Sequence, residues 1–451
     1  MGKLPRLYEC SEHIYEECGK GRKAGPEDEW AAAFCYVLAP VMLSYVLWVL
    51  EDALESGKRR LYFLARDGYM MYRVAEYFCR QRHLRLECRY LYCSRYALRC
   101  GEYGLLGDKS LDYICLGGME VTLEKMMERG GLTEAEILTA GERMGWGNRL
   151  RSRLSYEQVK ALKPQLRDNP FFMERMMAHS AEAYPHVLGY LRQEGLLEDV
   201  SYAVVDSGWT GSIQRSINRL LRSAGCDRPA EGYYFGLYEY VEGVEPEHYL
   251  TWYFAPESGN VRKAFFCNNL FECVFSSPEG MTKGYCRNGD RLEPVFAMEE
   301  NPNRKRIEEG TRLLLRYAER YAAGDGRGIF GKKKRKDREQ KVSARLLSSL
   351  MGRPSAGEAR IFGSYVFDDD VTGQERRAVA RALTPEEVKE ERLFGRLFRY
   401  AAGREHPAVQ SAWPEAGMVL AGASGSTALY KFLLYSRKSL EQKRKERRSV
   451  G

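Results

Sequence analysis

Hydrophobic residues in this chain form short runs that alternate with helical spacings. The short runs predict strands at Leu61–Leu64, Arg89–Cys93, Tyr202–Val205 and Gly232–Leu237. Apolar side chains with a period of 3.6 residues predict a helix over about Tyr69–Arg80, and a second helix is expected over Ile213–Ala224. Strands that alternate with helices predict an α/β fold with a doubly wound, mostly parallel sheet.

The sequence between these two strand–helix regions is richer in charged helical patterns. Helices are expected at Leu123–Arg129, Thr133–Met144, Tyr156–Leu166, Asn169–Tyr184 and Val187–Glu194. Thr133 with Glu136, and Ser155 with Gln158, have the spacing of capping boxes. The expected organisation is an irregular segment at 1–30, an α/β core at 31–104 and 201–298, a helical insertion or cap at 105–200, and a mainly helical region at 299–451. A β-rich stretch is expected over Tyr249–Phe296 within the core.

Composition indicates a globular protein of two or three structural units. The chain has 451 residues, of which 44% are hydrophobic and 29% charged, and a modest net charge of +8. Its twelve cysteines contain no CxxC spacing and its six histidines are scattered, so neither predicts a metal site. The charged and polar first 29 residues do not resemble a signal peptide, which favours a cytoplasmic protein with reduced thiols.

Two segments raise the question of membrane contact. The uncharged run Trp30–Leu50 is long enough to span a bilayer, but Pro40 interrupts it, so a buried helix pair broken near Pro40 is favoured. The basic run Lys332–Arg338 is expected to be a solvated linker, with docking to anionic lipid or nucleic acid as the alternative. No aromatic residue interrupts this run, so no nucleic acid partner is expected. The alternative to a purely cytoplasmic location is peripheral contact at the inner face of the membrane.

Polar residues and glycines follow two of the predicted strands. Arg66-Asp67-Gly68 follows the first strand, and the sequence DSGWTGS, residues 206–212, follows the third. Ligands bind at the carboxyl ends of strands in open α/β sheets, where the next helix presents free N–H groups to an anion. These junctions therefore predict a phosphate-binding site, although a tight turn and a capped helix are the alternatives.

Each candidate residue has a chemical role at that site. The expected phosphate or substrate ligands are Arg66, Gly68, Ser94, Arg95, Ser207, Gly208, Trp209, Thr210, Gly211 and Ser212. Among these, Ser94 and Arg95 follow the second strand, and Trp209 is expected to stack on a base or sugar. Asp67 and Asp206 are expected to bind Mg²⁺ or sugar hydroxyls and so to support catalysis. Glu272, in an apolar stretch, is the candidate general acid or base.

A separate acidic motif, residues 368–372, has the DxDxT pattern of phosphatases that use an aspartyl nucleophile. Too little chain follows it to build that fold. The catalytic interpretation of this motif is therefore not favoured.

The order LYFLARDG, LYCSRYAL, YAVVDSGWTGS and NLFECVFSSPEG resembles a region found in bacterial surface-polysaccharide gene clusters. That region is often fused behind a haloacid-dehalogenase-type hydrolase domain, and the resemblance covers about Ala31–Tyr285. No residue before Ala31 carries the nucleophile motif of that hydrolase, so its chemistry is not transferred to this chain.

The same order is similar to type I phosphoribosyltransferases. Leu61–Ala75 resembles their pyrophosphate-binding loop and Val204–Leu221 resembles their loop for ribose 5-phosphate. The chain differs at Ser207, where that family usually has a second acid. The resemblance implies an enzyme of cell-surface polysaccharide metabolism that transfers a glycosyl or phosphoryl group of a phosphorylated sugar or nucleotide. The alternatives are a non-catalytic phosphate-binding partner of a glycosyltransferase and a haloacid-dehalogenase-type phosphohydrolase.

Overall fold

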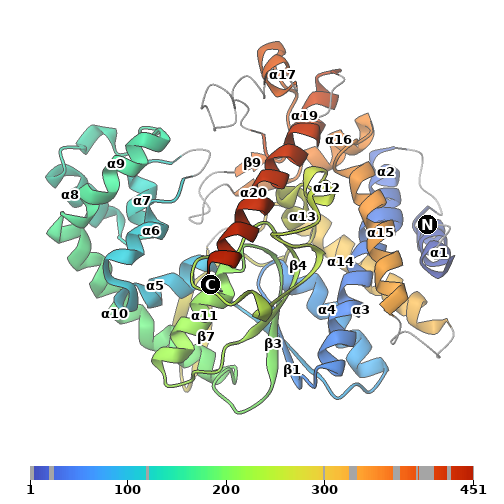
Figure 1. Cartoon of the computed structure of the whole chain (residues 1–451), viewed down its shortest axis with the longest axis horizontal. Coiled ribbons are helices and arrows are strands. Elements are labelled where there is room, and N and C mark those ends of the chain that lie inside the picture. Colours follow the sequence, from blue (N-terminus) through green and yellow to red (C-terminus); the bar gives the residue numbers. More distant parts are fainter. Residues whose placement is uncertain are drawn as a thin grey trace.

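A five-stranded, all-parallel sheet forms the centre of the computed structural model (Figure 1). The strands are β1 (Arg60–Leu64), β2 (Glu87–Leu91), β3 (Tyr202–Trp209), β4 (Glu231–Leu237) and β5 (Tyr249–Phe254). Their spatial order is β2-β1-β3-β4-β5, so the direction of winding reverses between β1 and β3. The structure describes residues 5–19, 25–117, 121–297, 300–324, 333–368, 376–392, 395, 411–423 and 428–449.

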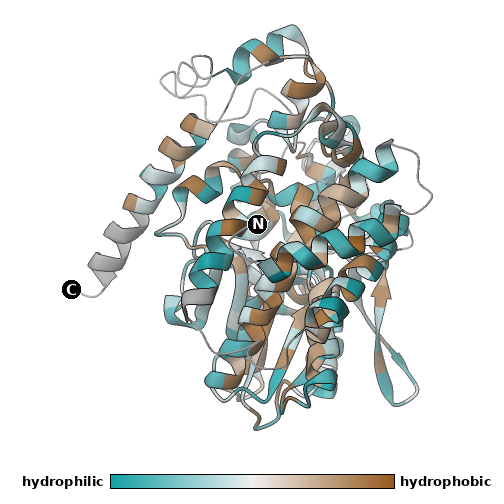
Figure 2. Ribbon diagram, turned by 90° about the vertical axis from the view of Figure 1, so that its right-hand side faces the viewer, coloured by the Kyte–Doolittle hydropathy of each residue, from teal (hydrophilic) through white to brown (hydrophobic). Residues whose placement is uncertain are grey.

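Helices cover both faces of the sheet, because its strands are apolar on both sides. Leu61 and Phe63 of β1 lie in one core with α3 (Ala39–Glu55), α4 (Gly68–Gln81), α14 (Arg304–Ala323) and α15 (Lys333–Leu350). Tyr62 and Leu64 point to the other face, which packs with α5 (Arg95–Leu106), α10 (Pro170–Gln193) and α11 (Ser212–Ser223). Many surface helices are banded hydrophilic and hydrophobic, as expected for one buried side (Figure 2). The predicted doubly wound α/β class is therefore confirmed at this level.

The remaining elements complete the layers around the sheet. Before the sheet, the chain forms α1 (Pro5–Gly19) and α2 (Pro26–Ala33). After it come α12 (Asn260–Ala264), α13 (Asn268–Val274) and the antiparallel hairpin β6 (Thr282–Asn288) and β7 (Arg291–Phe296). The C-terminal elements are α16 (Ala356–Gly363), β8 (Val366–Asp368), β9 (Arg376–Ala378), α17 (Pro385–Glu391), α19 (Pro414–Leu420) and α20 (Ala428–Ser449).

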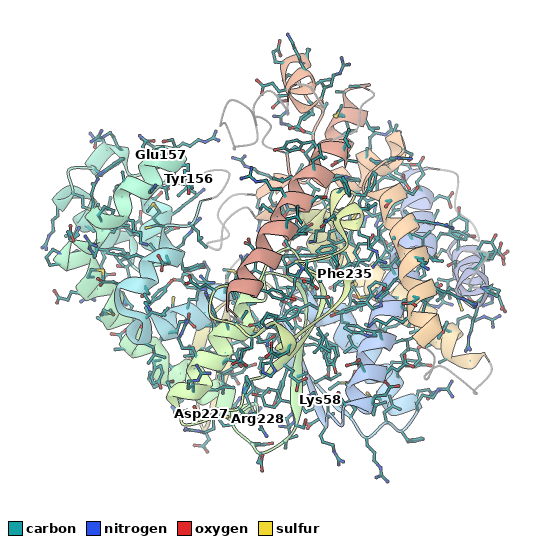
Figure 3. The ribbon with its side chains drawn as sticks, viewed as in Figure 1. Lys58, Tyr156, Glu157, Asp227, Arg228 and Phe235 are labelled. Atoms are coloured by element: carbon teal, nitrogen blue, oxygen red, sulfur yellow. The ribbon has the colours of Figure 1, made fainter. Side chains whose placement is uncertain are left out.

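The stretch 105–200 builds a helical lobe beside the sheet (Figure 1). It contains α6 (Leu111–Ile114), α7 (Leu123–Arg129), α8 (Glu134–Arg143), α9 (Tyr156–Arg167) and α10, and has its own hydrophobic core. Tyr156 and Glu157, at the start of α9, lie at the upper side of this lobe in the view of Figure 3. Both predicted capping boxes are present. The expected break near Pro185 is wrong: α10 continues through it, because packing of Ser180, Val187 and Tyr190 outweighs the loss of one backbone hydrogen bond.

The apolar run at 30–50 forms part of a continuous helix, Pro26–Glu55, rather than a pair broken at Pro40. A π-helical turn over Phe34–Leu38 immediately precedes the proline and adjusts the hydrogen-bond register there. In the described part of the chain, this helix alone is long and apolar enough to cross a membrane, and 89% of its apolar window is buried within the protein.

Three further expectations are corrected. The segment 1–30 is helical in α1 and α2, because Leu7, Cys10 and Ile14 provide a buried stripe. The described part of the basic run, residues 333–338, begins helix α15 instead of a linker, in agreement with the good helix propensity of Lys and Arg. The stretch 249–296 contains α12 and α13 as well as strands.

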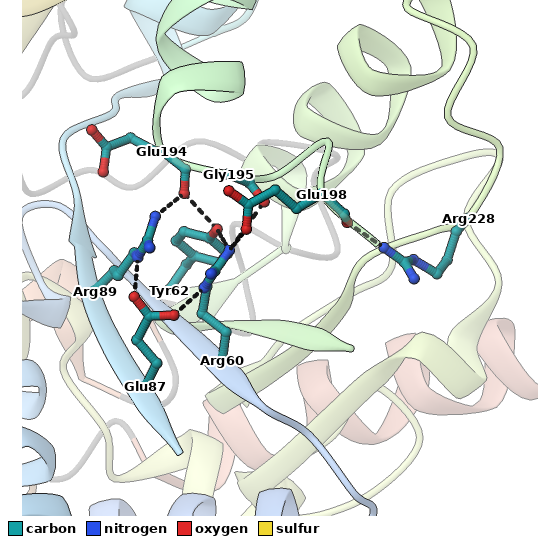
Figure 4. Close-up of polar contacts among 8 residues, drawn as sticks. All are labelled: Arg60, Tyr62, Glu87, Arg89, Glu194, Gly195, Glu198 and Arg228. Atoms are coloured by element: carbon teal, nitrogen blue, oxygen red, sulfur yellow. Dashed lines mark hydrogen bonds and ion pairs between the residues drawn. The ribbon is translucent and has the colours of Figure 1, made fainter. Parts of the chain in front are cut away.

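Charged residues at the amino ends of the strands are paired with one another (Figure 4). Arg60 contacts Glu87 at 2.5 Å and Glu198 at 2.8 Å, and Arg89 donates to the carbonyl oxygen of Glu194 at 2.6 Å. These contacts tie β1 and β2 to the turn before β3. This edge of the sheet is therefore held together by a network of charged side chains.

Candidate functional site

The fold brings the two predicted junctions together at the carboxyl edge of the sheet. Strands β1 and β3 are neighbours, and Phe63 is paired with Val205. Asp67, which comes after β1, and Asp206, which directly follows Val205, therefore lie at the same edge of the sheet. The hydroxyl of Ser207 donates a hydrogen bond to the carboxylate of Asp67 and joins the two junctions directly. The position is the topological switch point, where doubly wound sheets open into a ligand crevice.

The third strand is longer than the sequence predicts. It continues through Asp206 to Trp209, because Asp206 pairs with Tyr234 and Gly208 pairs with Gly236 on β4. The first four residues of the DSGWTGS motif are therefore strand, Thr210 and Gly211 form the connecting turn, and only Ser212 lies in helix α11. This extension fixes the main chain at Asp206, whose side chain is buried.

Tyr45 supports this extension and was missed by sequence reasoning. Its hydroxyl lies 3.0 Å from the carbonyl oxygen of Asp206 and 2.9 Å from that of Tyr233, and its side chain is fully buried. The signal available was a phenol within the otherwise apolar helix α3, which needs a buried partner.

Glu272 joins the two aspartates from helix α13. Its charge is close enough to raise the pKa of both Asp67 and Asp206. The carboxylate accepts a hydrogen bond from the indole N–H of Trp209. The structure therefore brings the three candidate catalytic residues close enough to interact electrostatically.

Burial dominates the electrostatics of the two aspartates. It raises the pKa of Asp67 well above its ordinary value, and the charges of Glu272 and Asp206 raise it further. Burial likewise raises the pKa of Asp206 to about 7, although the N–H groups of Ser207 and Gly208 oppose the shift. A carboxyl group with a pKa near neutrality can donate or accept a proton at physiological pH.

Unpaired cations lie beside these carboxylates. Within the described residues, the guanidinium groups of Arg66 and Arg95 form no hydrogen bond or ion pair, yet Arg66 lowers the pKa of Asp67 and Arg95 lowers that of Asp206. Helix α11 begins at Ser212, and its first turn has no side-chain cap. The hydroxyls of Thr210 and Ser212 also have no hydrogen-bond partner in the part of the chain that the structure describes. These groups are the ones suited to hold a phosphate.

Three predicted ligands have structural roles instead. The hydroxyl of Ser94 donates to the carbonyl oxygen of Thr282 at 2.6 Å and accepts the N–H of Ala97, so it caps helix α5. The hydroxyl of Ser207 is directed to Asp67. Trp209 was expected to stack on a ligand, but its ring packs against Phe254, Phe266 and Phe271, and its indole N–H holds Glu272.

The glycines at this edge are needed for backbone conformation and close packing. Gly208 and Gly211 have φ angles of +111° and +65°. A Cβ at Gly208 would lie 2.6 Å from the carbonyl oxygen of Gly236, and one at Gly211 would lie 2.5 Å from the ring of Tyr249. A Cβ at Gly68, the first residue of α4, would lie 3.0 Å from the main chain of Phe63. These positions let the loops approach the sheet closely.

The carboxylates of Asp67 and Asp206 are compatible with a magnesium ion that also binds a phosphate of the ligand. In the described chain, no group of three or more His, Cys, Asp or Glu side chains has the arrangement of a complete metal site. Mg²⁺, however, usually takes one or two carboxylates and completes its shell with water and substrate phosphates. Asp67 and Asp206 are two such carboxylates. Of the separate DxDxT motif, Asp368 ends β8 and residues 369–372 lie outside the described residues.

The fold is an α/β fold with a parallel sheet, compatible with double winding, and acidic and basic side chains cluster at the carboxyl edge of strands β1 and β3. No family model and no curated protein matches this chain. The side chains at the carboxyl edge of the sheet are therefore the features that indicate a function.

The raised pKa of Asp206 predicts a pH-dependent stability. Its ordinary pKa of 3.8 rises to about 7 on folding, so the folded state binds the proton more tightly. This contribution to stability is fully present below about pH 4 and is lost as the pH rises through about 7. We expect the unfolding free energy of Asp206→Asn, relative to the wild type, to increase by about 2 kcal/mol between pH 5 and pH 8.

Urea denaturation at the two pH values measures this difference. Asp290→Asn, at an exposed position, is the matched control. Its unfolding free energy should differ from that of the wild type by the same amount at both pH values. A constant difference for Asp206→Asn would mean that Asp206 titrates at an ordinary pKa.

Proposed function

We propose that this protein binds a phosphorylated sugar or nucleotide at the crevice and transfers its glycosyl or phosphoryl group. The observation that carries the proposal is the convergence of Asp67, Asp206 and Glu272 beside two unpaired arginines. Acidic groups that bind a metal ion or sugar hydroxyls, next to cations that bind phosphate, are the combination that such transfers require.

Each group has a defined task in this proposal. Arg66 and the first turn of α11, with Thr210 and Ser212, hold phosphate oxygens. Asp67 and Asp206 hold Mg²⁺ or sugar hydroxyls, and the ion, when bound, supplies positive charge next to the departing phosphate. Asp206 has a pKa of about 7, which makes it a better proton donor or acceptor at neutral pH than an ordinary aspartate.

The similarity to type I phosphoribosyltransferases supports glycosyl transfer as the reaction class. Its two loops correspond to the junctions after β1 and β3, which the fold places side by side. Surface-polysaccharide metabolism in the cytoplasm, with a possible glycosyltransferase partner, is the setting that the sequence resemblance suggests. These assignments are part of the proposal.

One observation favours a second candidate, a non-catalytic phosphate-binding protein. Ser207 occupies the position of the usual second acid, and its hydroxyl is hydrogen-bonded to Asp67. A site of this kind would retain the phosphate ligands and lack part of the acidic set. Binding without turnover would distinguish this candidate from the enzyme.

Calorimetry tests the proposal with 5-phosphoribosyl 1-pyrophosphate and ribose 5-phosphate, each with and without Mg²⁺. We expect the wild type to bind both, and Arg66→Gln to weaken binding by about tenfold or more, because a charge-assisted contact is lost. The control is Arg80→Gln, an exposed arginine near the C-terminal end of helix α4, which follows Arg66, and this variant should bind as the wild type does. Absence of binding to any phosphorylated probe would contradict the proposal.

A further inference from the structure

A second group of arginines lies between helices α5 and α11, beyond the crevice. Arg99 of α5 is 6% exposed, and its Nε is buried with no hydrogen-bond partner in the described residues. Its guanidinium lies 3.6 Å from the ring centroid of Tyr113, in the helical lobe. A buried guanidinium that is stacked on one side and has no hydrogen-bond acceptor at its Nε is costly to maintain without a ligand.

Arg215 approaches the same place from the first turns of α11. Its Nε is buried without a partner, and its one hydrogen bond, to the carbonyl oxygen of Glu242, is long at 3.4 Å. Burial lowers the pKa of Arg99, and the neighbouring charge of Arg215 lowers it further. Two cations of this kind repel each other unless an anion lies between them.

Burial lowers the pKa of both Arg99 and Arg215, and the buried carboxylate of Glu102 raises it through its charge, but that carboxylate is shared with a third arginine. Glu102 is almost fully buried and forms its ion pair with Arg219, at 2.7 Å. The group therefore has three arginines, Arg99, Arg215 and Arg219, around one carboxylate. Glu242 interacts with Arg215 through its charge as well as its carbonyl oxygen, but forms no ion pair with it in the described structure.

Arg95 connects this group to the crevice. It is exposed on the first turn of α5, one helical turn before Arg99, and its charge acts on both Asp206 and Tyr113. Arg95 and Arg99 share a face of α5 because they are four residues apart. A ligand held at Asp206 can therefore extend past Arg95 to Arg99 and Arg215.

We propose that Arg99 and Arg215 form a second anion-binding site, so that the natural ligand carries two separated anionic groups, one at the crevice and one between α5 and α11. This inference rests on the proposed function, because it extends the same ligand. It places the ligand among sugars or nucleotides with phosphate groups at two ends. The planar guanidinium groups of two arginines are suited to the oxygens of a phosphate or diphosphate.

The test compares two probes on the full-length protein by calorimetry in the presence of Mg²⁺. 5-Phosphoribosyl 1-pyrophosphate has anionic groups at both ends, whereas ribose 5-phosphate has one. We expect the first to bind the wild type at least tenfold more tightly than ribose 5-phosphate does, and Arg215→Gln to reduce that advantage severalfold without changing the affinity for ribose 5-phosphate. Arg99→Gln should act in the same way.

Arg222→Gln is the matched control, since Arg222 lies on α11 with a side chain that is 66% exposed and should leave both affinities unchanged. Arg215 is less buried than Arg99, so Arg215→Gln keeps the test valid if Arg99→Gln does not fold. The second site is wrong, and the proposed function stands, if ribose 5-phosphate binds and 5-phosphoribosyl 1-pyrophosphate binds no more tightly. The same conclusion follows if its advantage over ribose 5-phosphate is equal in the wild type and in Arg215→Gln. If neither probe binds the wild type, both proposals fail.

Discussion

Replacement of Asp206 by asparagine is expected to reduce turnover by about a thousandfold while the protein stays folded. The assay is release of inorganic pyrophosphate from 5-phosphoribosyl 1-pyrophosphate in the presence of Mg²⁺. The side chain is 8% exposed and lies beside Asp67 and Glu272 at the switch point of the sheet. Asparagine retains the shape and an oxygen acceptor for the N–H groups of Ser207 and Gly208, but loses the charge and the titratable proton.

The pattern of kinetic effects separates this role from a structural one. The exposed Asp290→Asn should retain full turnover, and the far-ultraviolet circular dichroism of Asp206→Asn should match that of the wild type. Undiminished turnover in Asp206→Asn would show that Asp206 is not required for the reaction. Lost turnover with retained binding would agree with a role in the reaction rather than in affinity.

Replacement of Gly232 by alanine is expected to lower the free energy of unfolding by about 3 kcal/mol or more. A Cβ at this position would lie 2.1 Å from Oε1 of Gln214 and 2.6 Å from the ring of Tyr234. Gln214 is fully buried, accepts the hydroxyl of Tyr234 at 2.6 Å, and donates to the carbonyl oxygens of Ala230 and His248. The added methyl group must displace this network or the backbone of β4.

The same change should weaken phosphate binding, because Gln214 lies in the first turn of α11. Gly284→Ala is the control: no atom lies within 4 Å of the Cβ position, and Gly284 is also in a strand. Urea denaturation of both variants measures the effect. Equal stability of Gly232→Ala and Gly284→Ala would show that the Gln214 network adapts at little cost.

The elements of the core could be read from hydrophobic spacing. Strands β1, β2 and β4 and helices α4, α7 and α11 lie within a few residues of the predicted ranges. Errors occurred where tertiary packing outweighs a local signal. Pro40 and Pro185 do not break their helices, and β3 continues past Val205, because burial and pairing with β4 stabilise the longer elements.

The site was predictable in its residues and less so in their roles. Asp67, Asp206 and Glu272 were identified because acidic residues followed strands or interrupted apolar sequence. The hydroxyls of Ser94 and Ser207 and the ring of Trp209 are used within the protein, which a sequence pattern does not reveal. Arg99 and Arg215 were missed, although the four-residue spacing of Arg95 and Arg99 was a signal that a helical-face reading of α5 could have used.

The sequence by itself determined which residues form strands and helices, and that acidic, basic and glycine residues follow the strands β1 and β3. These properties follow from local periodicity and from the chemistry of single residues. Only the tertiary structure decided that the carboxyl groups at positions 67, 206 and 272, which are far apart in the chain, interact electrostatically. The pKa of Asp206 rises to about 7 because burial and neighbouring carboxylates act through space, and distances in space are set by strand order and packing.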